Sequence, residues 1–440
     1  MGPLLRAEDS PALKHRNFRL LWSGQCFSLV GTWMQNTAVL WHVSLIAPAE
    51  DKALALGIVG LARVIPIVLL ALVGGVLADA IDRRKLMIVT QAAMALCATG
   101  LALYSFGGGH QLAPIYLLTA LTAAASSIDT PARSSLVPML VPREHLSNAI
   151  SLNTTLFQLA CVIGPSVAGV SLVWLDVSWL YAINALSFLP VIASLVAMRD
   201  LPLRDAKARP PATWAAAVEG VRFVLRAPLI RSSMLLDFNA AFFSSATALM
   251  PIFATDVLQV GPAGFGWLYA APSLGAVLAS CWMVKTEQRM RRRGLIFLWA
   301  IAGYGAATVV FGLSTSLPLT LAALVLLGAA DAVNMVLRNV IRQLHTPDEI
   351  RGRMTAVNVI FAQGGPQLGE FEAGVVAQAF GPAASVVSGG LACLAVTAWV
   401  AWKTPILRRY GTHEEALADV TLHPHPKAAV GARATLPTHT

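Results

Sequence analysis

Apolar residues fill long continuous stretches of this chain, and short polar segments separate them. Each stretch is about 20 residues or longer, the length that a helix needs to cross a hydrocarbon core of roughly 30 Å. The stretches lack the short polar and apolar alternation of membrane barrel strands. We therefore predict an all-α membrane protein with twelve transmembrane helices. The predicted spans are 18–45, 54–78, 86–106, 112–135, 148–174, 178–198, 229–254, 263–284, 294–314, 317–340, 353–379 and 382–402.

The composition supports a lipid environment. The chain has 440 residues, of which 56% are hydrophobic and only 12% are charged, with a mean hydropathy of +0.65. Soluble domains carry about 25% charged residues. The first span follows a basic leader and is too long for a signal-peptide core, so we expect it to be retained. The five cysteines lie singly within apolar stretches, which predicts no metal, cofactor or disulfide framework.

The net charge of +9 reflects membrane topology more than a nucleic-acid partner, because the cations occupy alternate loops. Such an asymmetry is typical of cytoplasmic loops. It predicts a multi-pass protein of the inner (plasma) membrane with both termini in the cytoplasm. The loops on the other side of the predicted membrane contain a single lysine or arginine, Lys52. The predicted cytoplasmic cations are Arg83, Arg84, Lys85, Arg143, Arg199, Arg204, Lys207, Arg209, Arg289, Arg291, Arg292, Arg293, Arg351 and Arg353.

Two halves of the chain share one plan. A constant shift of 205 residues aligns identical residues without a gap, which indicates a duplication of six helices and a parallel-repeat transporter architecture. We expect a cytoplasmic segment (1–17), an N-terminal half (18–198), a linker with an amphipathic helix (199–228), a C-terminal half (229–402) and a disordered tail (403–440). The aligned identities are Arg133/Arg338, Pro142/Pro347, Glu144/Glu349, Asn153/Asn358, Gln158/Gln363, Gly164/Gly369 and Gly169/Gly374.

The loop between the second and third spans concentrates charge in the stretch GGVLADAIDRRK. These residues resemble the loop 2–3 motif of the major facilitator superfamily, with Gly75, Asp79, Arg83 and Arg84 matching and Asp82 standing where glycine is usual. The resemblance implies that Asp79 holds the cytoplasmic side shut by engaging the other half near residues 352–353. A carboxylate beside helix N-terminal amides and an arginine is physically reasonable. An ordinary positive-inside loop is the alternative interpretation.

The stretch ACVIGPSVAG in the fifth span is similar to the antiporter motif of drug exporters, through Gly164, Pro165 and Gly169. In that family, the resemblance implies, the close packing of this helix goes with export. Plain helix packing without directional meaning is the alternative. The stretches NFRLLWSGQ, GTWMQ and DTPARSSLVP resemble the drug and siderophore exporter branch that includes the enterobactin exporters. This resemblance covers about residues 11–402 and specifies no substrate.

Polar residues inside the spans form stripes at helical spacing, and such residues normally face a cavity or a partner. The first, fourth, seventh and tenth spans carry them, and the family resemblance assigns these helices to the central cavity. Asp129 and Arg133 lie near the cytoplasmic end, where an inner-gate ion pair and a substrate contact are both open interpretations. The stripe residues proposed for the cavity are Gln25, Gln35, Asp237, Asp331, Asn334 and Arg338.

Three carboxylates are candidate proton carriers. Asp237, Asp331 and Glu370 lie within predicted spans, where a desolvated carboxylate can bind and release a proton near neutral pH. A structural hydrogen-bonding role for each of them is the alternative. Arg63 is a cation deep in the second span, and the sequence does not identify its partner.

The chain lacks a phosphate-binding loop and the H-E-x-x-H and G-x-S-x-G elements, so it is not expected to be an enzyme or an ATPase. We predict a monomeric secondary transporter that exports a small amphipathic compound by alternating access and proton antiport. A drug, a siderophore or a secondary metabolite would fit. A lysolipid or lipid flippase is one alternative, and a transport-inactive sensor on the same scaffold is another. The expected partners are the small-molecule substrate, protons and membrane lipid.

Overall fold

The computed structural model describes residues 10–199, 222, 224–225, 227–243, 246–286, 290, 292–345 and 351–411. At 71–76, 78–80, 246, 284–285, 343–344 and 351–363, only the backbone is described. This part of the chain contains helices and no strand, which confirms the all-α prediction. The long helices are α1 (Arg16–Ile46), α2 (Lys52–Ala80), α3 (Arg83–Phe106), α4 (Leu112–Leu140), α5 (Leu146–Ser171), α6 (Val177–Ala197), α8 (Pro228–Phe243), α10 (Gly261–Thr286), α11 (Arg293–Leu313), α12 (Leu317–His345), α13 (Arg351–Phe380) and α14 (Pro382–Lys403).

These helices are suited to a membrane by length and composition. Within the described ranges, nine helical segments are long and apolar enough to cross a bilayer. The observed bounds follow the predicted spans closely, because the apolar length of each span and the polar loops beside it are local properties of the sequence. α1 is not among these nine, and it carries the polar stripe that contains Gln25 and Gln35.

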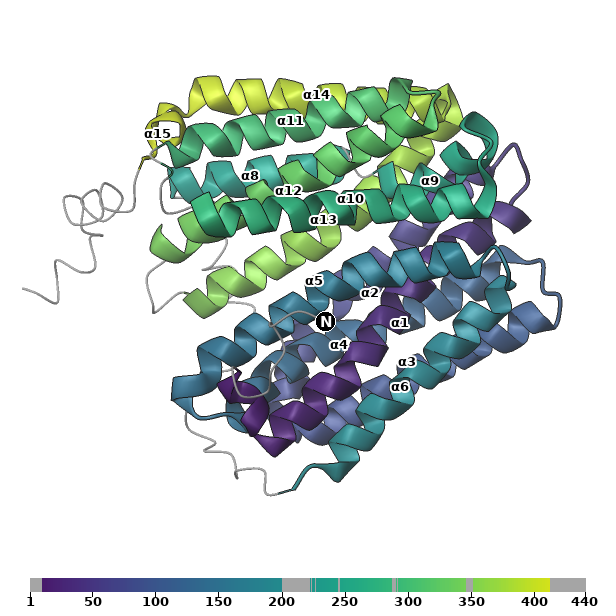
Figure 1. The fold of residues 1–440 in the computed structure, drawn as a ribbon, viewed down its shortest axis with the longest axis vertical. Coiled ribbons are helices and arrows are strands. Elements are labelled where there is room, and N and C mark those ends of the chain that lie inside the picture. Colours follow the sequence, from purple (N-terminus) through teal and green to yellow (C-terminus); the bar gives the residue numbers. More distant parts are fainter. Residues whose placement is uncertain are drawn as a thin grey trace, which may run out of the picture.

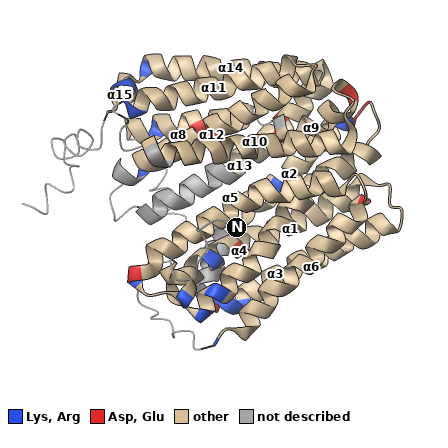
Figure 2. Cartoon of the chain, in the orientation of Figure 1, with Lys and Arg blue, Asp and Glu red and all other residues tan. Residues whose placement is uncertain are grey.

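The helices run between two ends that differ in charge. One end, called the basic end below, holds the connections at 81–82, 141–145 and 198–199 and the residues after α14. The opposite end holds the connections at 47–51, 107–111, 172–176, 258–260 and 314–316. In Figure 2 most lysine and arginine residues lie toward the basic end, on the left of the view.

Two bundles of six spans lie side by side (Figure 1). In the N-terminal half α1 packs on α5 and α6, and α3 packs on α4 and α6, while α2 packs on α4. The C-terminal half repeats these pairs, with α8 on α13 and α14, α11 on α12 and α14, and α10 on α12. The halves meet along two seams, α2 with α13 and α5 with α10. The two seams are equivalent under the repeat, as a duplication of one six-helix unit requires.

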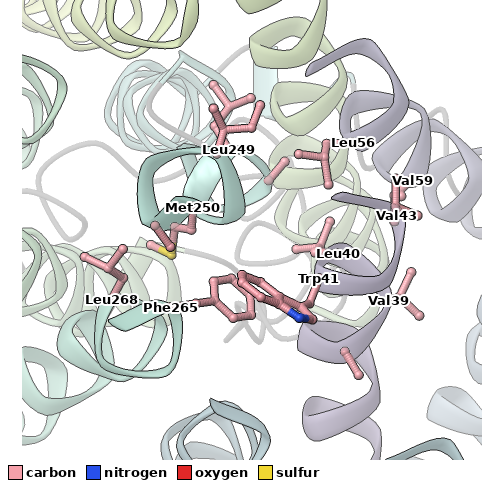
Figure 3. Packing of buried hydrophobic residues seen from close by; sticks show 14 of the residues in the cluster. Val39, Leu40, Trp41, Val43, Leu56, Val59, Leu249, Met250, Phe265 and Leu268 are labelled. Carbon is pink, nitrogen blue, oxygen red and sulfur yellow. The ribbon is translucent and has the colours of Figure 1, made fainter. Parts of the chain in front are cut away.

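Among the residues whose side chains are described, the apolar core is continuous between the halves toward the opposite end. There one cluster includes residues of α1, α2, α10 and α13, and Trp41 stacks on Phe265 across the halves with ring centroids 4.9 Å apart (Figure 3). Near the basic end the described buried residues form separate clusters, one around Phe18 and Leu136 and one around Phe297 and Leu337. The bundles in Figure 1 accordingly diverge toward the left.

The seventh predicted span is not one regular helix. α8 ends at Phe243, and the chain continues through η4 (Ala246–Leu249), the short helix α9 (Met250–Ile252) and the π-helical turn η5 (Phe253–Val257). Pro251 lies at the start of α9 and has no backbone N–H, so a regular helix cannot pass through it at full hydrogen bonding. The prediction of a continuous helix over 229–254 is therefore wrong in this respect.

The chain after α14 is partly ordered, which differs from the predicted tail. Helix α15 (Pro405–Arg409) follows directly, and its Leu407 is fully buried. The backbone N–H of Gly294 donates to the carbonyl of Tyr410 over 3.0 Å, which attaches this segment to the start of α11. Most of the predicted linker and amphipathic helix, and the tail from 412 onward, lie outside the described residues.

Candidate functional site

The charged loop between α2 and α3 is organised by Asp82. Its carboxylate accepts hydrogen bonds from the backbone N–H groups of Arg84 and Lys85, at 2.9 and 3.3 Å, and so caps the N-terminus of α3. Arg83 donates to the carbonyl of Ser135 on α4, and Arg84 donates to that of Val196 on α6. These contacts tie the loop to its own half.

Two residues of the same motif cannot be placed in this network. The side chain of Asp79 and the surroundings of Gly75 lie outside the described residues, as do the side chains at 352 and 353. The predicted contact between Asp79 and the start of α13 therefore stays a prediction.

Asp129 is the centre of a buried polar network inside the N-terminal half. Its carboxylate accepts hydrogen bonds from Thr90 and Gln91 of α3, at 2.9 and 3.0 Å, and lies 3.7 Å from the guanidinium of Arg133 one turn along α4. Ser28 of α1 donates to the side-chain oxygen of Gln91. Asp129 thus links three helices of one half, and the described contacts include none from it to the other half.

Gln25 and Gln35 face the interior of the N-terminal half. Both side chains are buried, and the side-chain oxygen of Gln35 accepts a hydrogen bond of 2.7 Å from Asn184 on α6. The amide nitrogen of Gln25 is buried without a hydrogen-bond partner among the described residues. Gln35 therefore joins α1 to α6, and its part in a substrate site stays a prediction.

The C-terminal half holds a compact charged cluster on α8 and α12. Asp237 forms an ion pair with Arg338 and accepts a hydrogen bond of 3.1 Å from Asn334. Asn334 and Arg338 occupy one face of α12, as the predicted stripe requires. Asp331 lies on the same face, nearer the opposite end, and it is exposed.

The clusters in the two halves are related by the repeat. The shift of 205 places Asn334 on Asp129 and Arg338 on Arg133. In the N-terminal half the arginine pairs with a carboxylate of its own helix, whereas in the C-terminal half it pairs with Asp237 on a different helix. The duplicated arginine therefore has a carboxylate partner in both halves, on its own helix in the N-terminal half and on α8 in the C-terminal half.

Glu370 lies in the seam between α2 and α13 and pairs with Arg63. The side chain of Arg63 is 9% exposed and that of Glu370 is 6% exposed. The guanidinium Nη1 lies 3.7 Å from the carboxylate Oε2. Thr247 of η4 donates to the other carboxylate oxygen over 3.2 Å. Arg63 also donates to the backbone carbonyl of Asn36 on α1, over 3.2 Å. Glu370 is thus the partner of Arg63 that the sequence left unidentified.

The antiporter-like stretch packs on both neighbours of α5. A Cβ atom at Gly164 would collide with Trp33 and the backbone of α1, and one at Gly169 would overlap the backbone of Gly266 on α10. Pro165 is buried between these glycines. Ser273 of α10 donates to the carbonyl of Cys161 over 3.1 Å. This face of α5 therefore forms part of the boundary between the halves.

Sequence patterns missed two contributors to these sites. Thr247 donates to Glu370 from the 3-10 helix η4, and Asn36 contributes through its backbone carbonyl. The described residues contain no group of three or more metal-ligating side chains, so the polar clusters consist of ion pairs and hydrogen bonds.

Comparison with protein families gives a match over nearly the whole chain. The family model described as transmembrane secretion effector covers residues 9–429. Among curated relatives, the enterobactin exporter EntS of Escherichia coli O1:K1 / APEC is 27% identical over 410 residues, 90% of this chain and 94% of the relative. The enterobactin exporter EntS of Shigella boydii serotype 18 is 28% identical over the same coverage.

Solved structures with this fold are transporters of low sequence identity. A bacterial homologue of the human lysosomal transporter Spinster, in an inward-facing and unoccupied conformation, gives a TM-score of 0.66 at 16% identity. That comparison covers 89% of this chain and 96% of the other. The peptide transporter POT in complex with sulfate gives 0.68 at 13% identity, with 90% and 95% covered. At such identities the similarity establishes the fold alone.

Proposed function

Because the chain belongs to the transmembrane secretion effector family of major facilitator transporters, and is therefore a multi-pass membrane transporter and not an enzyme, we propose that it exports a siderophore-like compound. The observation that supports this substrate class is the similarity to enterobactin exporters along 90% of the chain. Small amphipathic drugs and secondary metabolites belong to the same proposed range.

The proposed mechanism is alternating access. It is supported by the one-ended contact between the halves, which share an apolar core toward the opposite end while the described basic-end clusters remain separate. We place the basic end in the cytoplasm of an inner-membrane protein, following the distribution of cations. The structure then corresponds to a transporter closed to the outside.

The proposed coupling is proton antiport, with Asp237, Asp331 and Glu370 as the candidate carriers. Asp237 and Glu370 are each paired with an arginine of another helix, so a proton on either carboxylate would release that arginine. Asp331 has an exposed side chain and no cation partner in the described part of the chain. The gate residues around Asp79, Asp129 and Arg133 are proposed to control the cytoplasmic side.

The test is uptake into inverted membrane vesicles, which reports export in cells. A catecholate chelator, a hydroxamate chelator and a panel of fluorescent drugs are supplied with and without an imposed proton gradient. We expect gradient-dependent uptake of the catecholate, with loss of coupling in at least one of Asp237→Asn, Asp331→Asn and Glu370→Gln. Glu372→Gln serves as the control, because Glu372 lies two residues from Glu370 on α13 and is not part of the Arg63–Glu370 ion pair.

Other results would favour the alternatives. Gradient-independent movement of a labelled lysolipid in reconstituted vesicles would support a lipid flippase. Binding of a chelator without gradient-driven flux would support a sensor on this scaffold. Uptake that persists in all three carboxylate variants would contradict their part in proton coupling.

A further inference from the structure

Two arginines at the basic end of the N-terminal half converge on the end of one helix. α6 ends at Ala197, and the guanidinium of Arg16 on α1 donates to the carbonyl of that residue over 3.2 Å. Arg84 on α3 donates to the carbonyl of Val196 over 2.8 Å. Because the two carbonyls belong to adjacent residues, cations from two helices lie close together at the end of a third. Figure 2 shows lysine and arginine residues gathered at this end of the N-terminal bundle.

Arg199 adds a third cation to this place. It lies two residues after α6, and Asn17 of α1 holds its backbone. The side-chain nitrogen of Asn17 donates to the carbonyl of Arg199 over 2.6 Å, and its side-chain oxygen accepts from the N–H of Arg199 over 3.4 Å. Arg199 is exposed, and among the described residues its guanidinium has no hydrogen-bond or ion-pair partner. A fixed backbone therefore presents an unused guanidinium next to α1.

The positive charge of this cluster is not balanced by ion pairs. Inside the spans, each of three arginines has a carboxylate partner within 4.0 Å. By contrast, no carboxylate in the described ranges forms an ion pair with Arg16, Arg84 or Arg199. The nearby carboxylate of Asp82 accepts hydrogen bonds from the first turn of α3. The described part of this surface therefore carries excess positive charge.

An open cavity of about 240 Å³ adjoins the cluster. Its basic lining comes from the start of α1 and from the segment after α6, and its apolar lining comes from the last residue of α4. The cavity has room for a phosphate-sized group beside two of the arginines. The lining residues are His15, Arg16, Asn17, Leu140 and Arg199.

The C-terminal half fills the equivalent place with its own chain. The shift of 205 relates α3, α4 and α6 to α11, α12 and α14. After α14, helix α15 packs on α11, α14 and α8 and buries Leu407 (Figure 1). His345, the equivalent of Leu140, lies against the ring of Tyr410, with ring centroids 5.5 Å apart. In the N-terminal half no described segment occupies the corresponding cavity beside Leu140.

Apolar side chains next to the cluster face outward. α3 and α6 pack together and form an outer edge of the N-terminal bundle in Figure 1. Val196, at the end of α6, is exposed, as are Leu189 two turns earlier and Val89 on α3. Acyl chains can therefore lie against α3 and α6 while a headgroup reaches the arginines. Apolar contact beside cations suits a lipid better than a free anion.

We propose that Arg16, Arg84 and Arg199 bind the phosphate of an anionic phospholipid from the adjacent leaflet. The guanidinium group is planar and offers paired donors that match phosphate oxygens. Arg199 contributes an unused guanidinium, and the apolar edge of α3 and α6 holds the acyl chains. The site belongs to the N-terminal half, because α15 occupies the equivalent place in the C-terminal half. It requires neither the proposed substrate nor the proposed direction of transport.

The test counts lipids bound to the full-length protein by native mass spectrometry. Protein stripped of lipid in mild detergent is titrated with phosphatidylglycerol, or with phosphatidylcholine that has the same acyl chains. Inorganic phosphate is added as a competitor in a third series. We expect one phosphatidylglycerol to bind ahead of all further copies and ahead of phosphatidylcholine, and inorganic phosphate at equal concentration to leave it bound.

The arginine variants measure the contribution of the cluster. Arg199→Gln removes a guanidinium without removing any hydrogen bond of the described residues, so the fold should be unaffected. We expect about fivefold weaker binding of the first phosphatidylglycerol in Arg199→Gln and about 25-fold weaker binding in Arg16→Gln/Arg199→Gln. Arg16→Lys/Arg199→Lys should bind more tightly than the glutamine variant, because it keeps both charges. Arg199→Gln keeps the test decisive if the double variant fails to fold.

Two arginines of the C-terminal half provide a matched control. Arg408 and Arg409 on α15 are exposed cations near the same end of the molecule. Arg408→Gln/Arg409→Gln removes the same charge and should bind the first phosphatidylglycerol with wild-type affinity. Equal weakening in both double variants would indicate general attraction between charges and overturn the site. Unchanged binding in a folded Arg16→Gln/Arg199→Gln protein, or displacement of the lipid by inorganic phosphate, would overturn it as well.

Discussion

At the scale of single residues, two of the described ion pairs inside this protein cross between helices. Asp237 with Arg338 and Glu370 with Arg63 each join a carboxylate to a guanidinium on another helix. In a membrane environment an unpaired charge is costly, so each partner determines whether the other can stay ionised. The position of such a residue along its helix is visible in the sequence, whereas its partner is not.

The Asp237–Arg338 pair allows a test of this dependence. Arg338→Gln removes the cation and leaves Asp237 with Asn334, so we expect a loss of about 3–5 kcal/mol in the free energy of unfolding. Asp237→Asn/Arg338→Gln should recover a large part of that loss, because no buried charge remains unpaired. The measurement is the thermal stability of the purified protein in one detergent. Losses that simply add in the double variant would argue against a coupled pair.

At the scale of helices, the contacts between the halves depend on residues without bulky side chains. The antiporter-like stretch in α5 places Gly169 against Gly266, and the repeat places Gly374 against Gly57. Close backbone approach of this kind is the main route to tight helix packing in lipid, where the hydrophobic effect does not drive association. The seventh span contributes a polar contact instead, because Thr247 of η4 donates a hydrogen bond to the carboxylate of Glu370.

A single methyl group should disturb this packing. Gly169→Ala adds a Cβ that overlaps the Gly266 backbone, so we expect the seam between α5 and α10 to close poorly and transport to fall several-fold. The distance between spin labels at His110→Cys and Thr315→Cys, in a background without the native cysteines, measures the first effect, and uptake into inverted vesicles measures the second. Gly303→Ala on α11 is the control, because a Cβ there meets nothing within 4 Å. Unchanged distance and uptake in Gly169→Ala would show that the seam tolerates separation.

At the scale of the whole molecule, charge and core are distributed unequally between the two ends. Cations gather at the basic end, and the shared apolar core lies toward the opposite end (Figure 2). The proposed orientation places the shared core on the outer side and the separate clusters on the cytoplasmic side. The proposed direction of export depends on this orientation.

The orientation can be measured by labelling with a membrane-impermeant maleimide. In a cysteine-free background, His110→Cys and Thr315→Cys should react in intact cells, since they lie in exposed loops of the opposite end. Glu144→Cys lies in an exposed turn of the basic end and should react only after the membrane is permeabilised. The reverse pattern would invert the topology and the assigned direction of transport.

The sequence by itself determined the number of helices, their approximate ends, the duplication and the stripe positions of Asp237, Asn334, Arg338 and Glu370. These properties are local or periodic, because the length of an apolar span and the spacing of residues on one helix follow from a few neighbouring positions. The motif at the start of α3 was visible for the same reason, although the capping contact of Asp82 was not predicted.

Only the tertiary structure decided which residues meet. Asp237 and Arg338 are 101 positions apart, and Arg63 and Glu370 belong to different halves, so no periodicity relates them. The packing of the helices also brings Gln35 into contact with Asn184. The seventh span is interrupted near Pro251, and residues 405–409 form a helix. Contacts between distant segments depend on how whole helices pack, and packing is a property of the assembled bundle rather than of any one helix.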